Sequence, residues 1–211
     1  MAFDYKKEYK EFYLPPTTAT IVNIPALNFL AFRGKGDPNA EDGEYKRSVE
    51  QLYAIAYTLK MSYKSDYKIA GYFDYVVPPL EGLWWQDDTP GVDYSSKDDF
   101  NFISLIRLLD FVKKEDFTWA IEMATEKKKS DFSQVEFLTY EEGLCVQCLH
   151  LGAYDDEPTT IALMEDYAQA QGYALDITAT RYHHEIYLSD PRKCSGEQLK
   201  TVIRQPIKAK V

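Results

Sequence analysis

The chain has few of the residues that bind metals or form disulfides. Its 211 residues include three cysteines and three histidines. Three cysteines cannot form a disulfide framework, and no second Cys pair and no His-Glu-x-x-His motif is present. Cys145 and Cys148 have C-x-x-C spacing, but in a strand this odd offset sends them to opposite faces. We therefore expect buried thiols, no metal and no cofactor.

Positive charge, long apolar runs and nucleotide motifs are also scarce. Lys and Arg number 24 against 34 Asp and Glu, and a net charge of −10 repels the phosphates of a nucleic acid. No run approaches the roughly 20 apolar residues that span a bilayer, and Met1 to Lys10 lacks the apolar region of a signal peptide. Gly34-Lys35-Gly36 lacks the Lys-Ser/Thr step of a phosphate loop. We expect a cytoplasmic protein without a nucleic-acid or membrane partner.

Aromatic residues are abundant. They make up 15% of the chain, with 17 tyrosines, and hydrophobic residues reach 45%. Such a composition supports a sizeable core, and tyrosine combines a stackable ring with a polar tip. We expect one domain over 19–211 after an N-terminal extension at 1–18, with a first half at about 19–115 and a second at about 116–211.

Hydrophobic periodicity predicts a repeated order of elements. Each half contains a strand, a helix and two further strands, so the chain favours an α+β fold with a ligand cleft where the halves meet. Pro25 separates the first two expected strands, and Glu141-Glu142-Gly143 is expected to form a turn. The expected strands are 19–23, 29–34, the segment around 84–85, 118–123, 135–140, 144–151, 182–188 and 202–206, and the expected helices end near 60 and 172 or span 98–113.

Two adjacent tryptophans, Trp84 and Trp85, follow a Pro-Pro step and a Glu-Gly turn. Strand residues alternate faces, so one indole can fill the core while the other is free to hold an apolar, aromatic ligand. Either tryptophan can take either role. Trp119 falls in an expected strand on one face with Ile121 and Met123, which favours core burial over a place in the pocket.

Glu185 is the strongest charged candidate. Alternation places His183, Glu185 and Tyr187 on one strand face. A carboxylate there can bind a cation, orient a water or act as general base, and apolar surroundings would raise its pKa. The alternative is an exposed, polar strand face. A zinc site would need a third protein ligand, for which His150 is the remaining histidine, and no motif supports one.

Three segments resemble the GyrI-like small-molecule-binding family. They are PPLEGLWW at 78–85, LGAYDDEP at 151–158 and HEIYLSDPR at 184–192. The resemblance runs from about Ala19 to the C-terminus. It implies a pseudo-twofold fold with an antiparallel sheet, two strand–helix–strand–strand halves and a central ligand cleft. It also implies an aromatic-lined pocket around the glutamate that Glu185 matches.

The Trp-Trp segment is similar to a free-standing branch of that family, the cyclopropanoid hydrolases. Other members are effector-binding halves of transcription regulators, but the stretch before Ala19 is too short for a helix-turn-helix. The resemblance implies hydrolysis of the cyclopropane in DNA-alkylating drugs of the yatakemycin and duocarmycin class. Flat, nearly neutral drugs of this kind suit stacking on indole and phenol rings.

The hydrolase hypothesis assigns a role to each candidate. Glu185 would direct and deprotonate the water, and Tyr187 or His183 would hold the water or donate to the developing phenolate. The candidate ligand-binding residues are Trp84, Trp85, Trp119, His183 and His150. Two alternatives stay open: a binding protein that sequesters planar drugs without turnover, and a protein-interaction role such as the gyrase inhibition in the family name.

Overall fold

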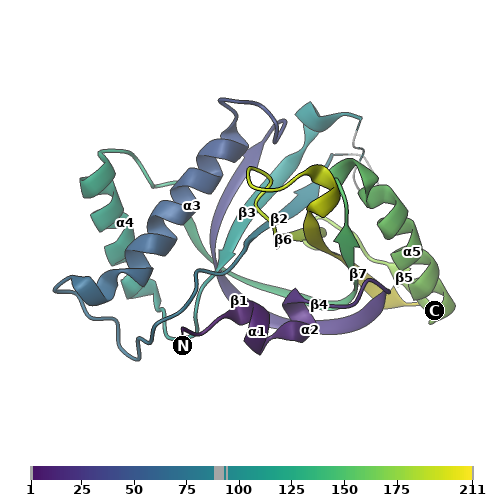
Figure 1. Cartoon of the computed structure of the whole chain (residues 1–211), viewed down its shortest axis with the longest axis horizontal. Helices are drawn as coiled ribbons and strands as arrows, with labels where there is room; N and C mark the ends of the chain where they lie inside the picture. The colour runs from purple at the N-terminus through teal and green to yellow at the C-terminus, as the bar shows by residue number, and fades with distance from the viewer. Residues whose placement is uncertain (1, 88–92, 94, 211) are drawn as a thin grey trace.

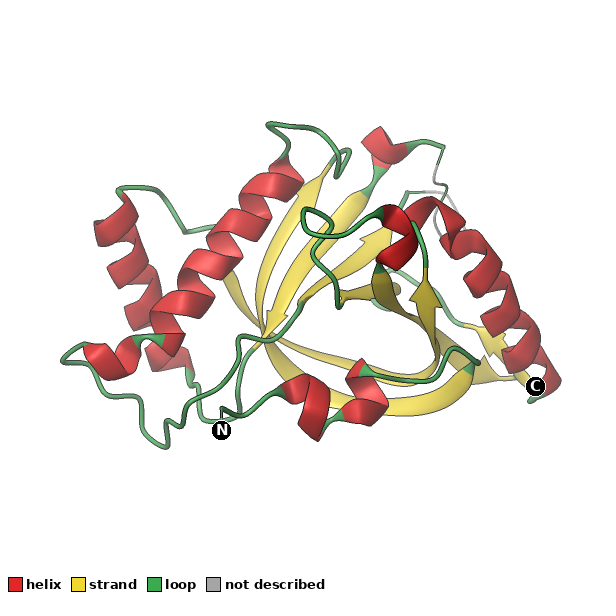
Figure 2. Cartoon of the chain, in the orientation of Figure 1, coloured by secondary structure: helices red, strands yellow, loops and turns green. Residues whose placement is uncertain are grey.

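A computed structural model describes residues 2–87, 93 and 95–210 of the chain, and its strands form one antiparallel sheet (Figures 1 and 2). The strand order is β4-β1-β3-β2-β6-β7-β5, and β4 also pairs with β7, so six of the strands close into a barrel-like ring. The strands are β1 (Thr20–Lys35), β2 (Leu80–Trp85), β3 (Asn101–Arg107), β4 (Glu136–Leu151), β5 (Tyr173–Leu175), β6 (His183–Tyr187) and β7 (Lys200–Ala209).

The helices follow the internal repeat that the sequence predicts. In the first half β1 leads into α3 (Glu44–Lys60), then β2 and β3. In the second half β4 leads into α5 (Glu157–Ala170), and after the short β5 come β6 and β7. This arrangement confirms the α+β fold of two strand–helix–strand–strand units. The remaining helices are α1 (Tyr5–Glu8), α2 (Lys10–Tyr13) and α4 (Lys114–Lys128), with short 3-10 turns η1 (Ser62–Lys64), η2 (Lys97–Asp99), η3 (Tyr154–Asp156) and η4 (Gly196–Gln198).

The two repeated helices pack on the same face of the sheet, which we call the helix face. Leu52, Ile55 and Leu59 of α3 join a buried cluster with Phe32 and Phe102 of the strands. Met164 and Ala168 of α5 join a smaller cluster with Val146, Cys148 and Ile203. The opposite face carries a third cluster, formed by Phe29, Ala31, Leu83, Ile103 and Leu105. Strands with two apolar faces are therefore enclosed on both sides.

The two long strands are continuous, which corrects two expected breaks. Pro25 lies inside β1 and Gly143 lies inside β4, and the two strands pair on both sides of these residues. Proline has a φ compatible with an extended strand. Gly143 has a φ of 70°, so glycine absorbs within the strand the irregularity that resembles a turn in the sequence.

Two other expectations were wrong in type. Residues 101–107 form β3 rather than a helix. The prediction failed because a central strand that is buried on both faces has a continuous apolar run, and a buried helix has the same kind of run. Residues 118–123 belong to α4 rather than to a strand. Its Asp116 accepts a hydrogen bond from the Lys113 backbone at 2.7 Å, and Ala120 and Ala124 are buried one turn apart.

The N-terminal segment covers the opposite face. Tyr13 of α2 donates to Glu81 at 3.2 Å, and the backbone carbonyls of Glu11 and Phe12 accept from Gln147 and Arg204 at 2.6 and 2.8 Å. Within the described residues, no helix is long and apolar enough to cross a membrane.

Candidate functional site

The site lies on the helix face of β6, between its partners β2 and β7. Glu185 is opposite Gly82 of β2 and Ile203 of β7, and His183 is opposite Trp84. Because paired residues share a face, this register brings His183, Glu185 and Tyr187 together on the side where α3 and α5 pack. The expected sharing of one strand face is confirmed.

The Glu185 carboxylate is buried and surrounded by donors. Its Oε1 accepts from His183 Nε2 at 3.0 Å, and its Oε2 accepts from the Tyr187 hydroxyl at 2.8 Å. The side chain is 10% exposed. The expected alternative, a solvated polar strand face, is therefore wrong. A carboxylate held by two neighbours of its own strand has a fixed orientation.

An indole reaches this carboxylate through a tyrosine. Trp84 Nε1 donates to the Tyr187 hydroxyl at 2.9 Å, and that hydroxyl in turn donates to Glu185. The path crosses directly above Gly82, where a Cβ would lie 2.5 Å from Trp84 Nε1 and 2.9 Å from the Tyr187 oxygen. Glycine in the Glu-Gly step of β2 is thus required by close approach of two side chains.

Further aromatic rings from both halves complete the surroundings. Tyr45 of α3 packs on Trp84 with ring centroids 5.2 Å apart, and its hydroxyl lies near Tyr187. Tyr154 of η3 meets the Tyr187 ring edge-on at 5.8 Å. Burial, together with the nearby Glu185 charge, raises the pKa of all three phenols, Tyr45, Tyr154 and Tyr187, so they remain protonated donors at neutral pH.

The pKa of Glu185 moves opposite to the direction expected for apolar surroundings. Burial works to raise it, but the hydrogen bond and electrostatic attraction of His183, with hydrogen bonds from Tyr187 and Glu157, outweigh burial and lower it. The carboxylate is therefore ionised at neutral pH. In this state it can accept a proton from water or stabilise a cationic centre.

The repeated strand–helix–strand–strand fold matches a known family. A family model for the GyrI-like small molecule binding domain matches residues 17–208. The chain belongs to this GyrI-like family. A comparison with curated proteins finds no match.

Several solved structures are similar to this GyrI-like domain. A crystal structure described as a hydrolase from Listeria innocua is 43% identical with a TM-score of 0.89, over 98% of this chain and 100% of that one. An uncharacterized conserved protein from Listeria innocua is 44% identical with a TM-score of 0.91, over 98% and 100%. The EcmrR C-terminal domain, at 15% identity, shares only the fold, with a TM-score of 0.54 over 92% of this chain and 98% of that one.

Of the residues proposed from the sequence, Trp85 and Trp119 lie away from Glu185, and His150 bonds to other partners. Trp85 points to the opposite face, where its ring packs on Tyr182 at 4.7 Å, so the two adjacent indoles alternate as expected. Trp119 stacks on Tyr67 at 4.4 Å on α4, which lies apart from β6 in Figure 1. His150 contacts Thr160 Oγ1 at 2.8 Å and the Ala153 carbonyl at 3.0 Å, so it joins the end of β4 to α5.

Sequence reasoning missed three neighbours of Glu185. Tyr45 belongs to the helix expected to end near 60, and Tyr154 and Glu157 belong to the segment at 151–158 that carries the family resemblance, but none of the three was singled out. A tyrosine at the start of an otherwise apolar helix stripe is the one local signal that Tyr45 offers. Their convergence depends on α3 and α5 packing on the same face, which spacing along the chain does not reveal.

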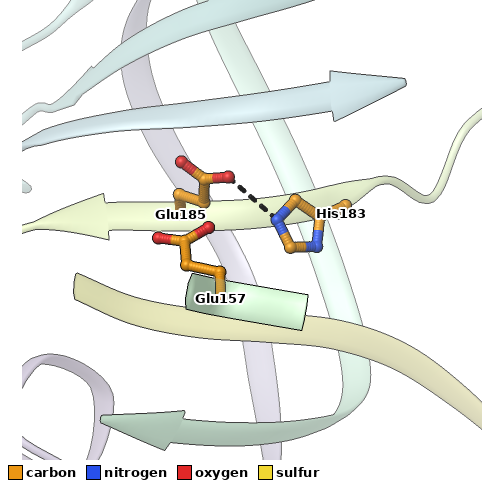
Figure 3. Close-up of side chains that lie close together, drawn as sticks. All are labelled: Glu157, His183 and Glu185. Atoms are coloured by element: carbon orange, nitrogen blue, oxygen red, sulfur yellow. Dashed lines mark hydrogen bonds and ion pairs between the residues drawn. The ribbon is translucent and has the colours of Figure 1, made fainter. Parts of the chain in front are cut away.

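Glu157, His183 and Glu185 form a compact set of possible ligand atoms (Figure 3). One ligand atom from each lies within 4.8 Å of the others, and all three residues are buried. Carboxylate and imidazole are ligands for a divalent cation. In the structure His183 Nε2 donates to Glu185 at 3.0 Å, and the Glu157 carboxyl lies beside this pair.

A second buried network occupies the opposite face. His184 bridges Glu142 at 3.1 Å and Glu81 at 3.0 Å, and Arg204 donates to Glu142 at 2.9 Å. A small cavity beside it is closed by Tyr13 of α2. Its charged groups are paired with one another, and α2 covers it. We therefore place the candidate small-molecule site at Glu185 instead.

Proposed function

We propose that this GyrI-like protein hydrolyses the cyclopropane of planar cyclopropanoid genotoxins, with Glu185 as the group that directs water. One observation carries the proposal: an ionised carboxylate, fixed by His183 and Tyr187, lies among aromatic rings from both halves of the domain. The description of a 43% identical Listeria innocua protein as a hydrolase supports it.

The chemistry requires no redox partner. A water oxygen forms a bond to a cyclopropane carbon, the strained C–C bond breaks, and its electron pair moves into the conjugated dienone to give a phenolate. The water proton passes to Glu185 and then to the phenolate oxygen. Trp84, Tyr45 and Tyr154 would hold the flat drug by stacking, and protonated phenols would meet the developing negative charge.

Turnover with a cyclopropanoid drug tests the proposal. Pure protein in catalytic amounts is incubated with the drug, and mass spectrometry follows the gain of one water. Many turnovers are expected. Glu185→Gln keeps the shape but removes the base, so it should lower turnover by roughly a hundredfold or more and leave binding within about tenfold. Glu126→Gln, an exposed residue of α4, is the matched control.

Two results contradict parts of the proposal. Unchanged drug, protected in a one-to-one ratio with protein, would make this a sequestering protein rather than a hydrolase. Full turnover in Glu185→Gln would remove Glu185 from the mechanism while leaving the reaction intact.

A further inference from the structure

Glu157 occupies an unusual position for the first residue of a helix. Acidic residues in a first turn ordinarily face solvent, where the helix dipole stabilises their charge. Glu157 begins α5 and is followed by Pro158, yet its side chain is 0% exposed. Its neighbours Asp155 and Asp156 in η3 are exposed. The chain therefore turns one carboxyl of an acidic run inward, toward β6 (Figure 3).

The inward carboxyl meets a second carboxyl. An oxygen of Glu157 lies within 4.8 Å of an oxygen of Glu185, and the interaction between the two carboxyls helps to lower the pKa of Glu185. Two buried carboxyl groups this close cannot both be ionised at modest cost, and a hydrogen bond between them requires that one carry a proton. His183 is the one basic side chain in this compact set, and it contacts Glu185.

The surroundings decide which carboxyl holds the proton. Glu185 accepts from His183 and from Tyr187, so both of its oxygens already face donors, and its side chain keeps 10% exposure. Glu157 is excluded from solvent. Donors and water stabilise the anion at Glu185, whereas full burial favours the neutral acid at Glu157.

We propose that Glu157 is a positioning residue that stays protonated at neutral pH and donates a hydrogen bond to Glu185. This inference deepens the proposed hydrolase function and rests on it for the catalytic consequence. The donated hydrogen bond keeps the Glu185 carboxylate ionised and holds its orientation toward the aromatic rings. Glu157 thus acts on the reaction through Glu185, while the phenols of Tyr45, Tyr154 and Tyr187 remain neutral around the pair.

Carboxyl NMR tests the proton directly, without substrate. Glutamate side-chain carboxyls are labelled with ¹³C, and the two resonances are assigned by their loss in Glu157→Gln and Glu185→Gln. At about pH 7 the Glu157 carboxyl should have the shift of a protonated acid, and the Glu185 carboxyl that of a carboxylate. Ionised signals from both residues would overturn the proposal.

Two substitutions of similar size separate the hydrogen bond from packing. Glu157→Gln keeps a donor to Glu185, whereas Glu157→Met fills the space without one. The titration midpoint of Glu185 should stay unchanged in the Gln variant and rise by about one pH unit in the Met variant. On the acid limb of the pH profile, turnover by the Glu157→Gln variant should stay within about threefold of that of the unmodified protein. Turnover by the Glu157→Met variant should fall roughly tenfold. Circular dichroism and thermal melting verify that both variants fold.

The outcomes are distinguishable from failure of the proposed function. If the wild-type protein does not hydrolyse the drug, the hydrolase proposal fails while the NMR titration still decides the state of the carboxyl pair. Equal midpoints in the Gln and Met variants would overturn the role of Glu157. A stoichiometric divalent metal in the purified protein that is lost in Glu157→Gln would also overturn it, because Glu157 would then be an ionised ligand.

Discussion

At the scale of single residues, a missing side chain shapes the site as much as the side chains present. Gly82 leaves the space through which the Trp84 indole donates to Tyr187, and Tyr187 transmits that contact to Glu185. The orientation of the Glu185 carboxylate therefore depends on Gly82, which has no side chain to contact it. This dependence is specific to the strand register, because Gly82 is opposite Glu185.

Gly82→Ala should destabilise the protein by about 1–3 kcal/mol, because the added Cβ meets two side chains that are locked in a buried hydrogen-bonded chain. Urea unfolding measures the change. Gly196→Ala is the matched control: its Cβ would lie 3.4 Å from Ala153, an ordinary contact, and it should change stability by less than about 0.5 kcal/mol. Equal effects in the two variants would contradict the close-approach argument.

At the scale of elements, α2 closes the opposite face by satisfying a buried charge network. The short helix supplies one hydroxyl and two backbone carbonyls to Glu81, Arg204 and Gln147. Helices this short are not stable alone, so the contacts with the sheet hold α2 in place. The same contacts complete the hydrogen bonding of charges that would be costly to bury unpaired.

Tyr13→Phe should therefore cost about 1–3 kcal/mol of stability, because it leaves one oxygen of the buried Glu81 carboxylate short of a donor. Guanidinium unfolding followed by circular dichroism measures it. Tyr63→Phe, at an exposed ring, serves as the control and should be nearly neutral. If Tyr13→Phe leaves the free energy of unfolding unchanged, this hydroxyl does not help to hold α2 in place.

The sequence predicted elements well where one pattern had one interpretation. Residues 44–60 and 157–170 form helices, and the strand at 183–187 has the expected alternation. The prediction from the sequence failed at β3, which was expected to be a helix, and at α4, part of which was expected to be a strand. The apolar run of β3 is buried on both faces, and the residues around Trp119 alternate by chance within a helix. Local periodicity cannot separate these cases, because burial of a second face is decided by partners distant in the sequence.

At the scale of the whole molecule, the network around His184 should set how stability depends on pH. Burial works to lower the pKa of His184, but Glu142 and Glu81 raise it from 6.5 to about 9. Burial works to raise the pKa of Glu142, but His184 and Arg204 lower it from 4.5 to about 2. The His184 contribution is complete below pH 6.5 and lost as pH rises through about 9, while that of Glu142 is complete above pH 4.5 and lost toward pH 2.

We therefore expect the free energy of unfolding to decline between about pH 6 and pH 10, measured by urea titration across that range. His184→Gln should lower stability at the acidic end and flatten the decline. The groups that face His184 are Glu81, Glu142, Arg204 and Tyr13, and burial raises the pKa of Tyr13 well above its usual value, so its hydroxyl stays protonated through this range. An unchanged slope in the variant would place the pH dependence elsewhere.

The sequence by itself determined the repeated order of elements, the alternation of Trp84 and Trp85, and the shared face of His183, Glu185 and Tyr187, because each follows from spacing within one element. The tertiary structure alone decided that Trp119 lies away from Glu185, that His150 bonds to Thr160, and that Tyr45, Tyr154 and Glu157 lie beside the carboxylate. Those positions depend on how α3 and α5 pack over β6. Such packing joins residues that lie between 28 (185 − 157) and 140 (185 − 45) positions apart in the sequence, and no local pattern encodes it.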